Sequence, residues 1–243
     1  MLFPRNIIRT IMECAHWADR LIRSELIIGE VVSETDYTSN FTGAFRREIN
    51  SRHVEDLTAK IQVLNPASER KYGADGCIIL QNKTHFKIGL FEAKWPRLRT
   101  QKNAWDSIQK SSGDSHFHSQ LSRQQPHSKY AAIWEMFYSE FPFFDQPPGF
   151  PDEGSACLWH SDAFTASVSR TNMAMPWNDT ELLGALDAKG TNIADIIEQI
   201  CLCLAGTPMP LSQFSYIFPD GAAPHSALVI TYGGKPIRPE RFD

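Results

Sequence analysis

The stretch that decides the fold runs from residue 73 to residue 94 and reads GADGCIILQNKTHFKIGLFEAK. Residues 77–80 are continuously apolar, as in a buried strand. From residue 86 onward the side chains alternate, which places five of them on one face of a second strand: Phe86, Ile88, Leu90, Glu92 and Lys94. The polar residues 81–85 between the two strands are few enough for a hairpin loop. We therefore predict an antiparallel hairpin.

This hairpin gathers charge at one end of the predicted sheet. If Leu80 lies near Phe86, antiparallel pairing places Asp75 opposite Phe91 or Glu92. Two carboxylates at close range repel each other unless a cation lies between them. Hard oxygen ligands of this kind suit Mg²⁺ or Mn²⁺. Lys94 follows two residues along the same face and would point at an anion held by that metal. Because it ends the strand before a proline, we expect it to contribute little to the core.

The pattern of Asp75, Glu92 and Lys94, written D-(x16)-E-A-K, resembles the PD-(D/E)XK nuclease superfamily, which has the restriction-endonuclease-like fold. Ala74 stands where that family usually has proline. The resemblance implies an α/β fold with an αβββαβ core, in which helices flank a central mixed sheet. It also implies an Mg²⁺-dependent endonuclease, with Mn²⁺ as a substitute, that hydrolyses the phosphodiester bonds of nucleic acid. DNA is the favoured substrate, and the products would carry a 5′ phosphate.

The same resemblance assigns roles around the metal. Asp75, Glu92 and the backbone carbonyl of Ala93 would hold the ion, and Lys94 would orient the nucleophile. The alternative is an exposed hairpin that carries a solvated Glu-x-Lys pair and no site.

A further acidic ligand is expected from the helix before the hairpin. The residues 33–36, SETD, are a helix-start pattern, and the helix continues to about Arg52. Glu48 is the only acid on its apolar stripe. The resemblance implies that a glutamate of this helix points at the metal, and Glu48 is the candidate. Alternatively, Glu48 lies at the edge of the stripe and pairs with Arg52. Glu34 is the rival candidate, although a capping role is simpler.

Basic and aromatic residues follow the hairpin. Trp95 and Trp105 enclose a segment with three cations, which would bind a phosphate backbone while the rings stack on a base: Arg97, Arg99 and Lys102. The alternative is a solvated loop with tryptophan packed beneath it.

A helix is predicted over residues 114–125, and the resemblance implies that it presents polar side chains to the site. Gln120 is the candidate catalytic residue, and Gln124, one turn later, is a candidate contact to nucleic acid. Pro126 breaks or kinks this helix. The spacing of the large apolar residues predicts that helix continues over residues 127–140.

The remaining elements complete the expected domain. We predict an N-terminal amphipathic helix that packs on the core, or else docks a second copy. Residues 155–160 are predicted as a strand beside the strand that carries Glu92, and residues 165–178 as an irregular substrate loop. The other expected elements are a strand at 57–63, a helix at 191–204 and a terminal hairpin of strands 215–218 and 227–232. The organisation is an N-terminal helix (1–30), a nuclease-like core (31–165) and a C-terminal helix and hairpin on the same domain (166–243).

Composition limits the class of protein. A net charge of −4 argues against a passive nucleic-acid coat. The five cysteines include no CxxC pair, so we expect neither a disulfide framework nor zinc, and we expect a reducing, cytoplasmic setting. No apolar run approaches the roughly 20 residues of a membrane span. The expected partner is a nucleic acid substrate, with a homodimer or protein partner as a further option. The competing hypothesis is a non-catalytic interaction protein that retains a nuclease-like fold.

Overall fold

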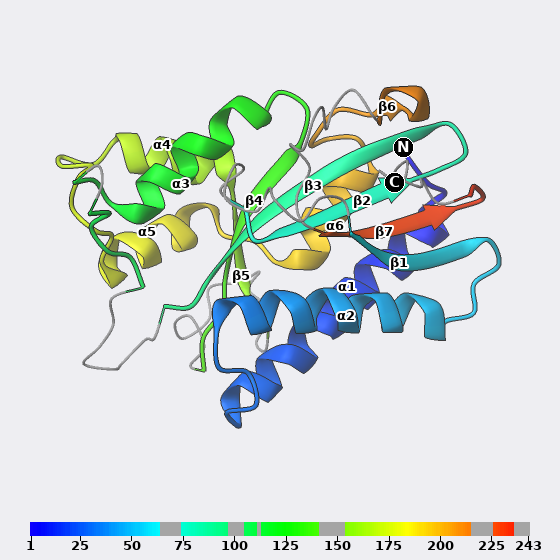
Figure 1. Ribbon diagram of the computed structural model, residues 1–243, viewed down its shortest axis with the longest axis horizontal. Helices are drawn as coiled ribbons and strands as arrows, with labels where there is room; N and C mark the ends of the chain where they lie inside the picture. Colours follow the sequence, from blue (N-terminus) through cyan, green and yellow to red (C-terminus); the bar gives the residue numbers. More distant parts are fainter. Residues whose placement is uncertain (64–73, 97–104, 111–112, 141–153, 215–225, 236–243) are drawn as a thin grey trace.

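A mixed, open β-sheet forms the centre of the molecule and carries helices on its faces (Figure 1). The computed structural model describes residues 1–63, 74–96, 105–110, 113–140, 154–214 and 226–235. Within these residues, seven strands are hydrogen-bonded in the order β1-β7-β2-β3-β4-β5, with β6 paired to β3. The strands are β1 (Leu57–Val63), β2 (Gly76–Gln81), β3 (His85–Lys94), β4 (Ala132–Phe137), β5 (Ala156–Trp159), β6 (Met209–Pro210) and β7 (Ser226–Tyr232).

Six α-helices and two short 3₁₀ helices accompany these strands in the described parts of the chain. The α-helices are α1 (Arg5–Ile27), α2 (Glu34–Ser51), α3 (His116–Gln124), α4 (His160–Val168), α5 (Asp179–Lys189) and α6 (Ile193–Cys201). The 3₁₀ helices are η1 (Gln125–His127) and η2 (Leu211–Gln213). None of the described helices has both the length and the apolar character needed to cross a bilayer.

The predicted hairpin is confirmed. β2 and β3 are antiparallel, with Gly76 opposite Phe91 and Gln81 opposite Phe86. The backbone N–H of Asp75 continues the ladder and donates to the carbonyl of Phe91 at 2.9 Å. Side chains alternate between two buried clusters, so both faces of β3 are covered, while the turn at residues 83–85 is exposed.

One large hydrophobic cluster joins the early, middle and late parts of the chain. It contains Ile7 of α1, Phe41 of α2, Phe91 of β3 and Ile197 of α6. The ring of Phe91 stacks on Trp134 at 5.3 Å between ring centres. As predicted, α2 begins after Ser33, whose hydroxyl accepts the N–H of Asp36, and α1 packs against it. The apolar stripes of the helices therefore fix α2 against the sheet.

The prediction of helix over residues 127–140 is wrong. Helix α3 gives way to η1 at Pro126, and residues 132–137 then form β4, which runs parallel to β3. All six side chains of this strand, the run AIWEMF, are buried. A central parallel strand buried on both faces is a continuous apolar run, so its large residues also happened to fit a helical spacing.

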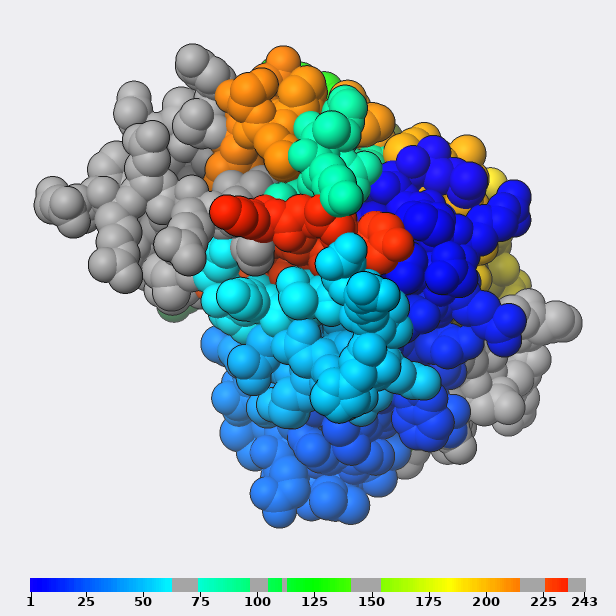
Figure 2. Space-filling model, turned by 90° about the vertical axis from the view of Figure 1, so that its right-hand side faces the viewer, coloured from blue at the N-terminus to red at the C-terminus, as the bar shows by residue number. Residues whose placement is uncertain are grey.

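Two further strands are not where the sequence placed them. β5 pairs with β4 and not with β3. β7 lies between β1 and β2, antiparallel to β1 and parallel to β2. In the space-filling view, β7 (red) separates β1 (cyan) from the tip of the β2–β3 hairpin (Figure 2). The partner predicted for β7, residues 215–218, lies outside the described residues. The expected irregular loop over residues 165–178 is in part the end of α4.

Candidate functional site

Asp75, Glu92 and Lys94 come together where β2 begins and β3 ends. The β2–β3 register, extended by one pair, places Asp75 opposite Glu92. The N–H of Ala93 donates to Asp75 Oδ2 at 3.0 Å, and Lys94 Nζ donates to Glu92 Oε1 at 2.6 Å. Glu92 is 1% exposed and Lys94 is 4% exposed. The expectation that Lys94 lies near the surface is therefore wrong, because β4 and α2 enclose the end of the strand.

Two more predicted candidates reach this cluster. Gln120 of α3 donates from Nε2 to Glu92 Oε1, so it lies inside the site as predicted. Glu34, the first residue of α2, accepts the N–H of Trp95 at 3.0 Å through Oε1. Its charge acts on both Lys94 and Asp75. Glu34 is therefore the acid that α2 supplies.

Glu48, the preferred candidate from the sequence, is not brought to the cluster. It follows Glu34 by fourteen residues in one continuous helix, which is roughly 21 Å along the axis at 1.5 Å per residue. Its charge acts instead on Cys14 of α1. Helix α2 runs along the sheet, and its first residue, Glu34, reaches the end of β3 through Trp95 (Figure 1).

A fourth acid, Glu135, was missed by the sequence. It lies on β4 in register with Glu92, and it is fully buried. Its Oε2 accepts a long hydrogen bond of 3.4 Å from Gln124, while Oε1 has no hydrogen-bond partner among the described residues. Nδ1 of His160 lies 3.6 Å from Oε1. The sequence did not reveal Glu135 because it did not reveal strand β4. Glu135 lies beside Glu92 only because residues 132–137 pair in parallel with β3.

Gln124, predicted to bind nucleic acid, donates to Glu135 of the cluster. Gln124 is fully buried and its Oε1 lies 2.8 Å from Nδ1 of His160, so it faces the interior and not a nucleic acid. Arg97, Arg99 and Lys102 lie outside the described residues.

The electrostatics of the cluster follow from several acids sharing one ammonium group. Burial raises the pKa of Glu92 well above its ordinary value; Lys94 opposes this, while Asp75 and Glu135 add to it. Burial of its surroundings also raises the pKa of Asp75, although that residue is itself exposed. For Lys94, burial alone would lower the pKa, but the negative charges of Glu92, Glu34 and Asp75 outweigh it and raise the pKa. The surroundings therefore stabilise the charged form of Lys94, and this single ammonium group does not compensate the several acids around it.

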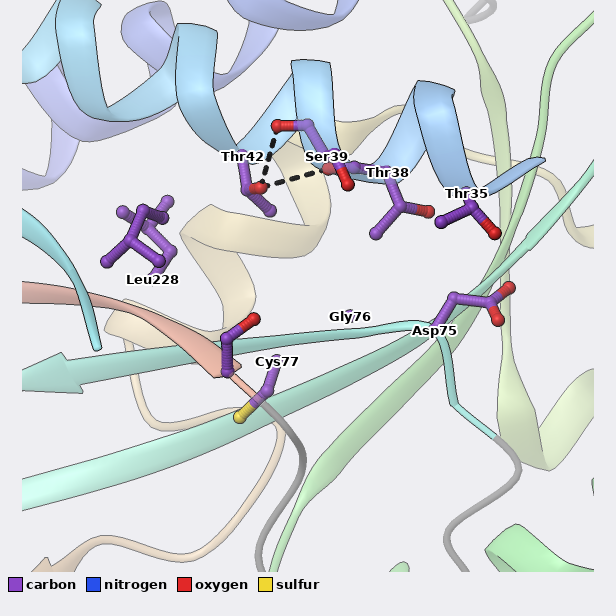
Figure 3. Close-up of a pocket in the computed structure, with 10 residues that line it drawn as sticks. Thr35, Thr38, Ser39, Thr42, Asp75, Gly76, Cys77 and Leu228 are labelled. Atoms are coloured by element: carbon purple, nitrogen blue, oxygen red, sulfur yellow. Dashed lines mark hydrogen bonds between the residues drawn. The ribbon is translucent and has the colours of Figure 1, made fainter. Parts of the chain in front are cut away.

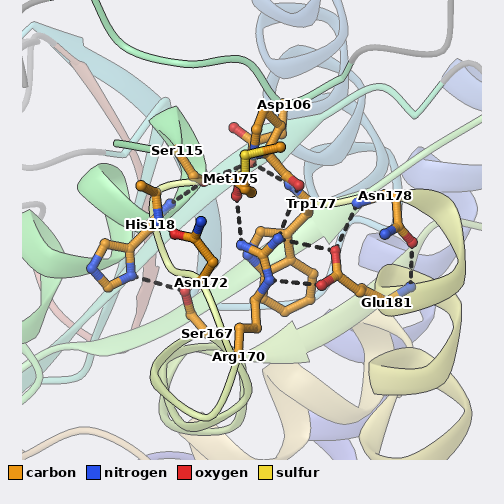
Figure 4. A network of polar contacts seen from close by, with 12 residues as sticks. Asp106, Ser115, His118, Ser167, Arg170, Asn172, Met175, Trp177, Asn178 and Glu181 are labelled. Carbon is orange, nitrogen blue, oxygen red and sulfur yellow. Dashed lines mark hydrogen bonds and ion pairs between the residues drawn. The ribbon is translucent and has the colours of Figure 1, made fainter. Parts of the chain in front are cut away.

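A buried aspartate holds the start of α3 and thereby positions Gln120. Asp106, 4% exposed, accepts the Phe117 N–H through Oδ1 at 2.9 Å. Its Oδ2 accepts the Ser115 hydroxyl at 2.6 Å and the Trp177 N–H at 2.8 Å. Figure 4 shows Asp106 above this group, with Arg170 and Glu181 paired beside Trp177. No local pattern predicts this role, because Asp106 and Trp177 are 71 residues apart and meet only in the folded chain.

The cluster contains a few oxygen donors of the kind that a divalent cation takes. No group of three His, Cys, Asp or Glu side chains in the described ranges is arranged to hold a metal. Asp75 and Glu92 with the carbonyl of Ala93 remain as donors. Mg²⁺ at phosphate-binding sites typically uses one or two carboxylates and completes its shell with water and substrate. The raised pKa values of both acids indicate that positive charge is lacking here, which a cation would supply.

No protein-family model, no curated protein and no solved structure matches the chain. We define the acid cluster as Glu34, Asp75, Glu92, Glu135 and the ammonium group of Lys94.

Proposed function

We propose that the chain is an Mg²⁺-dependent nuclease that hydrolyses phosphodiester bonds, with DNA as the favoured substrate. One observation carries the proposal: the β2–β3 hairpin places Asp75, Glu92 and Lys94 in one cluster, with 2.6 Å between the Lys94 ammonium and the Glu92 carboxylate. Two carboxylates beside a buried lysine are suited to holding a cation together with a phosphate.

The arrangement of elements supports the nuclease-like fold. The order α2, β1, β2, β3, α3, β4 agrees with an αβββαβ core, and β4 lies parallel to β3. Gln120 of α3 and Glu34 of α2 both approach the strand ends, as the resemblance implies for its helices. The position of β7 between β1 and β2 departs from a plain three-stranded meander, so we propose the core with this strand inserted.

Asp75, Glu92, Lys94 and Gln120 each have a chemical task under this proposal. Asp75 and Glu92 would hold the ion together with the Ala93 carbonyl. Mg²⁺, when bound, would act as a Lewis acid that draws charge from the phosphodiester and eases attack by water. Lys94 is a cation with a raised pKa, so it serves to hold the water and to offset phosphate charge, and it does not act as a base. Gln120 fixes the Glu92 carboxylate through its amide.

A second candidate function is a non-catalytic interaction protein with a nuclease-like fold. The observation that favours it is the outer face of α1 and the turn after it, where large apolar side chains are exposed: Trp17, Leu21, Ile27 and Ile28. Such side chains gathered on one surface suit a protein partner or a second copy of the chain. This function predicts binding without cleavage.

The test is cleavage of nucleic acid with a matched pair of variants. Supercoiled plasmid, single-stranded DNA and single-stranded RNA are incubated with wild type, Asp75→Asn and the control Asp187→Asn, which changes an exposed acid of α5. Asparagine at residue 75 still accepts the Ala93 N–H, so the fold is kept. We expect cleavage that requires Mg²⁺, falls at least a hundredfold in Asp75→Asn and is unchanged in the control. Equal cleavage by all three proteins would refute the proposed site.

A further inference from the structure

A groove of about 300 Å³ opens beside the acid cluster, between α2 and the sheet (Figure 3). One wall is the first half of α2, and the other is formed by Asp75 with residues of β1, β2 and β7. The apolar side chains of its floor are Ile61 and Leu228. The Cys77 side chain belongs to the cluster on the opposite face of the sheet. The volume lies at the lower end of the range for small-molecule sites. Asp75 belongs to both the cluster and the groove, so whatever fills the groove lies next to the proposed reaction.

The helical wall is a row of hydroxyl groups. Thr35, Thr38, Ser39 and Thr42 follow the spacing i, i+3, i+4, i+7, which places them on one face of α2. The hydroxyl of Thr42 is used within the helix, since it donates to the carbonyls of Thr38 and Ser39. In Figure 3, Thr35 and Thr38 face the open space above Asp75 from the opposite wall.

Thr38 is the residue that points to a ligand. It is 7% exposed, and its Oγ1 has no hydrogen-bond partner among the described residues. A buried hydroxyl without a hydrogen-bond partner is unfavourable, so it is rarely left in that state. Because Thr38 lines the groove, a ligand in the groove is in position to provide that partner.

The charge of the groove indicates the kind of ligand. None of its described lining residues is a lysine or arginine, and the one charged residue is Asp75. An isolated anion would be repelled here. The groove offers hydroxyls that donate and accept, a carboxylate that accepts, and an apolar floor. This combination suits a neutral group with polar edges and a flat apolar face.

We propose that the groove binds one nucleoside unit, base and sugar, of the substrate strand, adjacent to the phosphodiester at the acid cluster. The choice of a nucleoside rests on the proposed function. The base lies on the apolar floor, and its polar edge or the sugar hydroxyl bonds to Thr38. The groove thus positions the substrate strand so that the phosphodiester to be cleaved lies at the acid cluster. The phosphate itself interacts with Lys94 and not with the groove.

The test separates the groove from the chemistry by using metal-free protein and free nucleosides. Binding of adenosine, guanosine, cytidine, thymidine and inorganic phosphate is followed by ligand-observed NMR for wild type, Thr38→Val and the control Thr58→Val, an exposed position on β1. We expect at least one nucleoside to bind, inorganic phosphate not to compete, and Thr38→Val to weaken binding about three- to tenfold, as for one neutral hydrogen bond. Thr38→Val should also melt at or above the wild-type temperature, because it removes an unpaired hydroxyl.

Two outcomes would overturn the inference: nucleoside binding equal in wild type and Thr38→Val, or displacement of the nucleoside by phosphate. If nucleosides bind in a Thr38-dependent way but the protein cleaves no substrate, the nucleoside site is supported and the proposed nuclease activity is refuted. If Thr38→Val cleaves nucleic acid with an unchanged KM, the nuclease activity is supported and the nucleoside site in the groove is refuted.

Discussion

Replacing Lys94 by methionine should destabilise the protein strongly, and more so at high pH. The ammonium lies 2.6 Å from Glu92 Oε1, and both side chains are almost fully buried. Removing one member of such a pair leaves the other charge without compensation, which typically costs about 3–5 kcal/mol. Methionine keeps the apolar stem, so the change isolates the charge.

The expected magnitude depends on the protonation of Glu92. Its pKa is already raised, and loss of Lys94 removes the main influence that lowers it. At low pH the variant carries a neutral Glu92, and the cost falls to that of a charged hydrogen bond, about 1.5–3 kcal/mol. As pH rises, the folded variant must give up a proton that it binds more tightly than the unfolded chain does, so its stability falls. We therefore expect Lys94→Met to lower the free energy of unfolding by about 1.5–3 kcal/mol at pH 5.5 and by about 3–5 kcal/mol at pH 8.5.

Urea unfolding of metal-free protein at the two pH values measures this effect. Lys60→Met, at an exposed position of β1, is the control and should change stability by less than about 0.5 kcal/mol. Adding Glu92→Gln to Lys94→Met should recover much of the loss at pH 8.5. A loss below 0.5 kcal/mol at both pH values would mean that Lys94 is not the buried partner of Glu92.

Three further perturbations test the surroundings of the cluster. Because burial raises the pKa of Glu92 above its ordinary value of 4.5, the metal-free folded protein binds more protons than the unfolded chain above that pH, and its stability should fall as pH rises, by up to about 1.4 kcal/mol per unit. Glu92→Gln should remove that part of the slope in a urea series, and an unchanged slope would contradict the shift. Asp106→Ala leaves three buried donors without their acceptor and should cost at least about 3 kcal/mol in thermal unfolding; a cost below 1 kcal/mol would mean that Asp106 does not hold α3. Lys87, fully buried, donates to the carbonyl of Ile200 at the end of α6 at 2.7 Å, so Lys87→Met should cost about 1.5–3 kcal/mol and speed hydrogen exchange there; unchanged exchange would argue against this capping role.

The hairpin and its charges were predictable because the relevant signals are local. Alternation along β3 and the short polar loop fix the register, and the register alone places Asp75 opposite Glu92. The helix start at Ser33 was predictable for the same reason, since the cap and its partner are three residues apart.

The remaining parts depend on contacts between distant residues. β4 was missed because burial on both faces removes the alternation by which a strand is recognised, and Glu135 was missed with it. Glu48 was preferred over Glu34 because it stands on an apolar stripe, yet only the direction of α2 across the sheet decides which glutamate meets the strand ends. The burial of Lys94 likewise depends on neighbouring elements that a strand-end position does not reveal.

The most direct test of the central claim is a change of metal preference at Asp75. Thiolate is a softer ligand than carboxylate and a poor one for Mg²⁺, while it binds Mn²⁺ and Cd²⁺ better. We predict that Asp75→Cys loses plasmid cleavage in Mg²⁺ and regains part of it in Mn²⁺ or Cd²⁺, under conditions in which the wild type shows no such gain over its activity in Mg²⁺. Cleavage by Asp75→Cys in Mg²⁺ at the wild-type rate would contradict the claim that Asp75 holds the catalytic metal.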